Sequence, residues 1–241
     1  MRAQHTDIRS MAHRLRNIFK GCAVSSRIRV NELFEGHKYN SSTFSNIDWH
    51  KMEQILDEFS QSTFNSLNAK FHVEVCQEDK IYSFLSEVRF ARVVKSIDPG
   101  VRFIIPKSTP TPDIRATISG QQVDFEVSRL VEHSFSSATP MDKIVNSFKL
   151  KVSNELKQLT LPVSAVVVAP ERNWSVESTY RWILPDVKAA LGTFSQVPCV
   201  IIHLQYVPVN PLGWILLNSK ATSPMPTSVA NSLVSLGFVK V

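Results

Sequence analysis

Two carboxylates, Asp113 and Glu126, have the spacing that most suggests chemistry in this 241-residue sequence. They belong to residues 111–130, TPDIRATISGQQVDFEVSRL, in which polar and apolar side chains alternate as in two short strands. A two-residue turn at Ser119-Gly120 places the two carboxylates directly opposite each other. Because like charges at opposite positions destabilise a hairpin, we expect a cation between them. Mg²⁺, which binds one or two carboxylates together with water, suits this position.

The same turn places Arg115 opposite Asp124, and these two side chains form an ordinary cross-strand ion pair. A hairpin with one polar face in water accounts for this pair as well as a metal site does. It does not account for the opposed carboxylates, so we interpret those as the metal site.

A third carboxylate, Glu87, lies in a predicted helix over residues 80–97. Three of its four neighbours at helical spacing are apolar, namely Phe84, Phe90 and Ala91. Glu87 is therefore expected near the buried face, where an unpaired carboxylate is costly. A buried salt bridge and participation in the metal site both satisfy this requirement, and periodicity does not choose between them.

Three segments, SEVRFARVV, TPDIRATISG and VDFEVSRL, together resemble the PD-(D/E)xK nuclease-like superfamily, and the resemblance extends over about residues 84–226. The motif consists of an inward-facing Glu on a helix, a Pro-Asp at the start of a strand, and a Glu/Asp-x-Lys on the next strand. In this sequence the matching residues are Glu87, Pro112-Asp113 and Glu126-Val127-Ser128.

The resemblance implies a restriction-endonuclease-like fold and metal-dependent hydrolysis of phosphodiester bonds in DNA or RNA. Asp113, Glu126 and the carbonyl of Val127 would hold one or two Mg²⁺ or Mn²⁺ ions, with Glu87 helping directly or through water. The metal would activate a water molecule and stabilise the charge that develops on the phosphate oxygens.

Ser128 stands where the family has its catalytic lysine, and a hydroxyl group carries no positive charge. Three outcomes are open. Another lysine supplies the charge, with Lys107, Lys149 and Lys151 as candidates; the metal acts alone in a slower enzyme; or catalysis is lost. In the last case the chain would be a degenerate nuclease fold that binds nucleic acid or a protein partner.

The N-terminal residues 1–46 read as a basic arm that precedes a nuclease-like domain over 47–241. Residues 1–40 contain eight basic and three acidic side chains and so contribute most of the net charge of +6. Such an arm attracts polyanions, although a solvated surface explains the charge equally well. The candidate nucleic-acid contacts are Arg9, Arg14, Arg16 and Lys20.

Periodicity predicts an α/β fold whose mixed sheet contains the antiparallel hairpin and has helices on both faces. The expected helices are one after an N-cap at Asp48, 80–97, 140–159, 175–191 interrupted at Pro185, and 226–236 with Pro226 in its first turn. The expected strands are 71–75, 101–105, the hairpin within 111–130, 163–169, 197–204 and 214–217.

Other classes of protein lack their signatures in this sequence. No apolar run is long enough to span a bilayer, and the three cysteines form no CxxC pair. Dinucleotide-binding, P-loop and nucleophile-elbow motifs are absent. We therefore expect a cytoplasmic protein with nucleic acid as its partner, no membrane partner, and a homodimer if it oligomerises.

Overall fold

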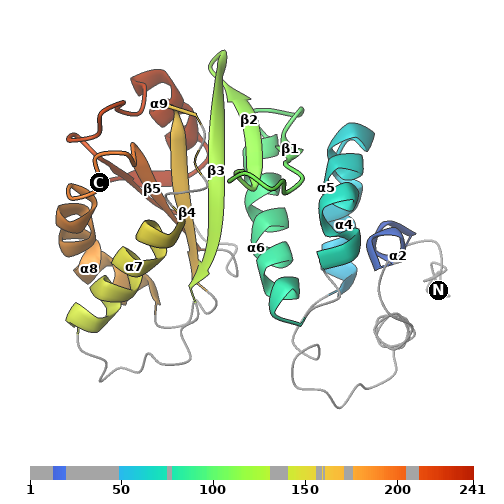
Figure 1. Ribbon diagram of the computed structural model, residues 1–241, viewed down its shortest axis with the longest axis horizontal. Coiled ribbons are helices and arrows are strands. Elements are labelled where there is room, and N and C mark those ends of the chain that lie inside the picture. The colour runs from blue at the N-terminus through green and yellow to red at the C-terminus, as the bar shows by residue number, and fades with distance from the viewer. Residues whose placement is uncertain are drawn as a thin grey trace, which may run out of the picture.

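The computed structural model has a seven-stranded mixed sheet with helices packed on both faces (Figure 1). The predicted α/β class with a mixed sheet is confirmed. Among the described residues, none of the helices has the length and apolar character needed to cross a membrane. The structure describes residues 13–19, 49–74, 78–130, 141–155, 159, 161–170, 176–204 and 212–241.

The strands follow one another across the sheet in sequence order, from β1 to β7. The hairpin strands β2 and β3 are antiparallel, whereas β3, β4 and β5 are parallel to one another. β6 runs antiparallel to β5, and β7 runs parallel to β6. The strand bounds are β1 Arg102–Phe103, β2 Ile114–Ile118, β3 Gln121–Leu130, β4 Ser164–Pro170, β5 Cys199–His203, β6 Gly213–Leu217 and β7 Phe238–Lys240.

Two apolar cores lie on opposite faces of the sheet, which is why β4 and β5 are apolar at every central position. Helices α2, α4, α5, α6 and α9 contribute to one core, and α7 and α8 to the other. Figure 1 shows α7 and α8 on one side of β3 and β4, with α6 and then α4 and α5 on the other. The helix bounds are α2 His13–Phe19, α4 Trp49–Asp57, α5 Gln61–Glu74, α6 Glu78–Lys95, α7 Met141–Glu155, α8 Val176–Leu191 and α9 Thr227–Ser235.

The hairpin has the predicted register, with Arg115 paired to Asp124. Ser119 and Gly120 form its turn, with φ angles of 51° and 77°. Both are in the left-handed region, as a two-residue hairpin turn requires. The alternative of a polar face in water does not hold for β3, because Asp124 and Glu126 are both buried on that face.

Several local predictions were wrong. Residues 71–74 form the last turn of α5 rather than a strand, because Phe64, Leu67 and Phe71 are buried along one side of that helix. α8 continues through Pro185 because buried side chains on both sides of the proline pack the helix against the sheet.

Other element ends differ from expectation. Strand β1 is shorter than the predicted 101–105, and β7 was not predicted. Pro226 precedes α9 as its N-cap residue instead of lying in the first turn. Asp48, the predicted N-cap of α4, lies outside the described residues.

Candidate functional site

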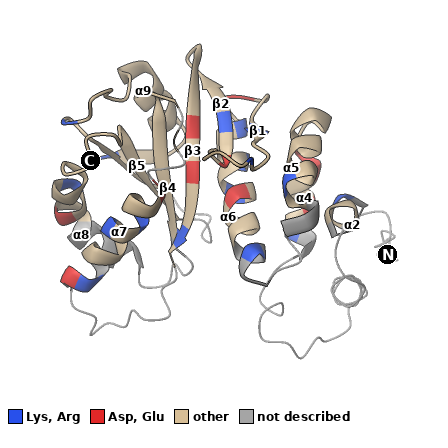
Figure 2. Cartoon of the chain, viewed as in Figure 1, with Lys and Arg blue, Asp and Glu red and all other residues tan. Residues whose placement is uncertain are grey.

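An open cavity of about 740 Å³ brings together residues from the hairpin, α5, α6, α7 and the segment before β2. Figure 2 shows an acidic part of β3 beside the acidic part of α6. All of the residues predicted from the nuclease-like motif line this cavity. They are Glu87, Asp113, Glu126, Val127 and Ser128, joined by Lys70 and by Glu155 from the end of α7.

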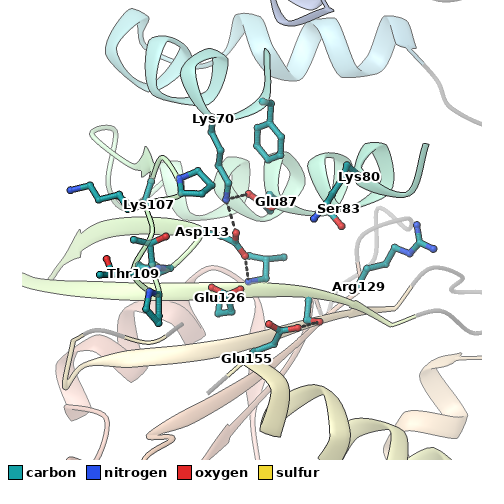
Figure 3. A pocket seen from close by; sticks show the side chains of 18 of the residues that line it. Lys70, Lys80, Ser83, Glu87, Lys107, Thr109, Asp113, Glu126, Arg129 and Glu155 are labelled. Atoms are coloured by element: carbon teal, nitrogen blue, oxygen red, sulfur yellow. Dashed lines mark hydrogen bonds and ion pairs between the residues drawn. The ribbon is translucent and has the colours of Figure 1, made fainter. Parts of the chain in front are cut away.

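Lys70 is a buried cation at the centre of this group (Figure 3). Its Nζ atom lies 2.8 Å from Oε2 of Glu87 and 2.5 Å from Oδ1 of Asp113. Burial alone would lower the pKa of this ammonium, but the charges of Glu87 and Asp113 outweigh it and raise the pKa. Lys70 is therefore a permanent cation, and it satisfies Glu87 by the buried salt bridge that periodicity had left open.

Asp113 directly precedes β2, next to the first paired residue of that strand, Ile114. Its backbone N–H donates to the carbonyl of Phe125 at 3.1 Å. Its Oδ2 atom accepts the backbone N–H of Val127 at 2.8 Å, while Oδ1 contacts Lys70. Both carboxylate oxygens are therefore held in place by donors from two different elements.

Glu126 points to the face of β3 that carries α7. Its neighbours Phe125 and Val127 belong to the core on the α6 face, and side chains alternate along a strand. Its register partner on β4, Val166, belongs to the core on the α7 face. Glu126 is only 7% exposed, and its Oε2 atom has no hydrogen-bond partner among the residues that the structure describes.

The carboxyl group of Glu126 is held in its neutral form in the folded protein. Burial, followed by the negative charges of Asp113, Glu155 and Glu87, raises its pKa to about 11, and the charge of Lys70 only partly offsets this rise. A proton on Glu126 offsets the surrounding negative charge, and a bound cation at the same position would do so as well.

The raised pKa of Glu126 predicts a loss of stability at alkaline pH. The unfolded chain releases this proton near its ordinary pKa of 4.5, so folding is favoured fully below that pH and less as pH rises toward 11. Between pH 7 and 9, without divalent metal, we expect the free energy of unfolding to fall by up to about 1.4 kcal/mol per pH unit relative to Glu126→Gln. Urea unfolding at several pH values measures this difference, and parallel curves for the two proteins would contradict it.

Ser128 does not face Lys70. It lies on the α7 face of β3 with Glu126, and its hydroxyl group donates to Oε1 of Glu155 at 2.8 Å. The residue that replaces the family's lysine thus connects the strand to a further carboxylate. Glu155 is the last residue of α7 and is half-buried at the cavity wall.

Basic side chains form the rim of the cavity around these carboxylates. Lys80 and Lys107 are exposed, whereas Arg129 and Lys151 are half-buried. Two of the three lysines proposed from the sequence as substitutes at the site, Lys107 and Lys151, therefore reach the cavity. Lys149 is exposed and does not line it.

Sequence reasoning missed Lys70 and Glu155. A signal for Lys70 was present, because it follows Leu67 by three positions and lies beside Phe71 in a helical apolar stripe. Because residues 71–75 were predicted to form a strand, the helical spacing that includes Lys70 was not recognised. Glu155 gave no comparable signal, because only the packing of α7 against β3 brings it to Ser128.

Arg14 is the one predicted nucleic-acid contact whose side chain the structure describes. Its guanidinium group donates to the carbonyl of Leu56 and, at 3.1 Å, to that of Phe59. It also lies 3.3 Å from Asp57 and 4.7 Å from the ring centre of Phe64. These contacts fasten α2 to α4 and α5. Arg9, Lys20 and the side chain of Arg16 lie outside the described residues.

The buried carboxylate of Glu53 anchors the start of α2, because it accepts the backbone N–H groups of Arg14 at 2.8 Å and Leu15 at 2.9 Å. Glu53→Ala leaves both donors without this partner, so we expect the free energy of unfolding to fall by about 1–3 kcal/mol. Thermal or urea unfolding checks this, with the exposed Asp142→Asn as control. An unchanged midpoint would show that these two hydrogen bonds contribute nothing to stability.

The donor set of the cavity fits a hard divalent cation in type, because it consists of carboxylate oxygens. Among the described residues, no three Asp, Glu, His or Cys side chains gather closely enough to hold a metal ion. Mg²⁺ commonly uses only one or two carboxylates, together with water and substrate phosphates. The unpartnered Oε2 atom of Glu126 is consistent with such a ligand.

Comparison with known proteins gives no family for the chain. No protein-family model matches it, and no curated protein or solved structure shows a significant similarity.

Proposed function

We propose that this protein is a metal-dependent nuclease-like phosphodiesterase that acts on nucleic acid and has a restriction-endonuclease-like fold. The observation that carries the proposal is the cavity itself, in which four carboxylates and a buried lysine lie inside a rim of basic side chains. The four carboxylates are Glu87, Asp113, Glu126 and Glu155.

The order of the elements supports the resemblance to the PD-(D/E)xK superfamily. An inward-facing acid on α6 is followed by an acid at the start of β2 and another on β3. The chain then returns through α7 to β4, which pairs parallel to β3. Glu87, Asp113 and Glu126 reach one cavity through this order.

Different groups in the cavity would have different roles in hydrolysis. A bound Mg²⁺ or Mn²⁺ ion would supply Lewis acidity and a reactive water molecule. Lys70 holds Asp113 and Glu87 in place and adds a fixed positive charge to the site. The rim cations Lys107 and Arg129, which lie on different sides of the carboxylates in Figure 3, would bind the phosphates of an extended substrate.

The second candidate is a nuclease-like fold that has lost catalysis and binds nucleic acid or a protein partner. The salt bridges of Lys70 favour this alternative, because they satisfy Glu87 and Asp113 without a metal ion. Metal binding and cleavage therefore have to be measured separately.

Cleavage assays on single-stranded DNA, double-stranded DNA and RNA, with Mg²⁺, Mn²⁺ or EDTA, test the proposed function. We expect metal-dependent products from the native chain and none from Asp113→Asn, with Asp142→Asn on the surface of α7 as the matched control. Retention of a labelled nucleic acid without cleavage in any metal would favour the binding module.

A further inference from the structure

The carboxylates of the cavity lie on two sides of β3. Lys70 and Glu87 come from α5 and α6, which pack on one face of the sheet. Glu126 and Ser128 point to the other face, where Glu155 ends α7. Figure 3 shows this division, with Lys70 and Glu87 on one side of the strand and Glu155 on the other.

Charge compensation differs sharply between the two sides. On the α6 side, the Lys70 ammonium contacts both Glu87 and Asp113. On the α7 side, no basic side chain forms an ion pair with Glu126 or Glu155 within the part of the chain that the structure describes. The Lys70 ammonium thus compensates two carboxylates, and the carboxyl groups of Glu126 and Glu155 have no ion-pair partner among the described residues.

The buried Oε2 atom of Glu126 supports a missing ligand on this side. Only 7% of the surface of Glu126 is exposed, and its Oε2 atom has no hydrogen-bond partner among the described residues. Buried carboxylate oxygens normally accept hydrogen bonds or bind metal ions. Glu155, held by Ser128, supplies a second carboxylate beside it.

We propose that one divalent cation binds between Glu126 and Glu155 on the α7 side of β3, while the Lys70 ammonium remains as the cation on the α6 side. Glu155 is then a metal ligand outside the nuclease-like motif, and Ser128 is the positioning residue that holds it. This inference rests on the metal dependence of the proposed function but not on cleavage.

The assignment gives a physical reason for serine at position 128. A lysine at this position would place its ammonium on the same face as Glu126 and Glu155, where it would compete with a bound cation. Serine donates one hydrogen bond to Glu155 and leaves both carboxyl groups available to a cation. With Lys70 already supplying a fixed cation, the α7 side is free for a divalent ion.

Titration of the full chain with Mn²⁺ alone, followed by the electron paramagnetic resonance signal of free Mn²⁺, tests this arrangement. We expect one bound ion per chain. Glu126→Gln and Glu155→Gln should each weaken binding at least about 10-fold, whereas Glu87→Gln should change it less than about 3-fold. Asp142→Asn on α7 is the matched control, and the thermal midpoint of each variant shows that it is folded.

Ser128 variants test the positioning role separately. Ser128→Ala should weaken Mn²⁺ binding several-fold, and Ser128→Thr, which keeps the hydroxyl group, should restore it. Ser128→Lys should weaken binding more than Ser128→Ala does, because its ammonium would compete with the ion for Glu155. A merely structural role for Ser128 would alter stability without this ordered effect on Mn²⁺ affinity.

Several results would overturn the proposal. These are two bound Mn²⁺ ions per chain, native affinity in Glu155→Gln, or a loss in Glu87→Gln as large as that in Glu155→Gln. The last two outcomes would leave the proposed hydrolysis intact with a differently placed metal. Mn²⁺ binding that needs Glu126 and Glu155, without cleavage of any nucleic acid, would sustain the ion site and reject the nuclease. No Mn²⁺ binding at all would reject both.

Discussion

Replacing Lys70 by methionine should lower the free energy of unfolding by about 3–5 kcal/mol, measured by urea unfolding at pH 7 without divalent metal. The substitution keeps a long apolar side chain but removes the ammonium that contacts Glu87 and Asp113. The side chain of Glu87 is 5% exposed, so its charge would lose its cation away from water. Removing one member of a buried ion pair is costly for this reason.

The double variant Lys70→Met/Glu87→Gln separates the salt bridge from packing. Because it removes the charge of Glu87 together with that of Lys70, it should recover a large part of the lost stability. Lys143→Met, on the exposed surface of α7, should stay within about 0.5 kcal/mol of the native chain. A Lys70→Met protein as stable as the control would mean that the buried contacts of Lys70 contribute nothing.

Glu126→Gln should reduce metal-dependent cleavage of nucleic acid by about 10³-fold, which corresponds to about 4 kcal/mol in activation free energy. The amide has the shape of the neutral carboxyl group that the metal-free protein contains, so the fold should be retained. It cannot become a carboxylate, however, and therefore cannot supply the negative oxygen that a divalent cation needs. Rates are compared at saturating Mg²⁺ and Mn²⁺.

A stability measurement makes this second result interpretable. In the absence of metal, Glu126→Gln should be at least as stable as the native chain above pH 7, because it cannot ionise in its buried position. Lost cleavage in a folded variant then reports on the chemistry of the site. Native cleavage rates in Glu126→Gln would remove Glu126 from the mechanism and favour a different set of ligands.

Local sequence patterns were sufficient where neighbours along the chain determine the structure. The hairpin register followed from the alternation of side chains and from Ser119-Gly120, which together allow one turn and one pairing. Continuous apolar runs predicted the buried strands β4 and β5, because a strand that is covered on both faces is apolar at successive positions. The pattern failed at residues 71–74, where alternating side chains favour a strand but burial of one helical face prevails.

The site was only partly predictable, because its members come from segments far apart in the chain. The opposed positions of Asp113 and Glu126 indicated a missing cation. Lys70 lies 43 residues before Asp113, and Ser128 lies 27 residues before Glu155. No local spacing connects residues that meet only because α5 packs against β1 and α7 packs against β3.

The sequence by itself therefore determined the hairpin, its alternating faces and three acids, Glu87, Asp113 and Glu126, that belong to one site. Only the tertiary structure decided which cation neutralises which acid. Lys70 reaches Glu87 and Asp113 because α5 and α6 contribute to the same core, whereas Glu126 points to the opposite face, where Ser128 holds Glu155. The alternation of side chains along a strand determines the face to which each acid points. The packing of the helices determines which charged side chains lie on that face.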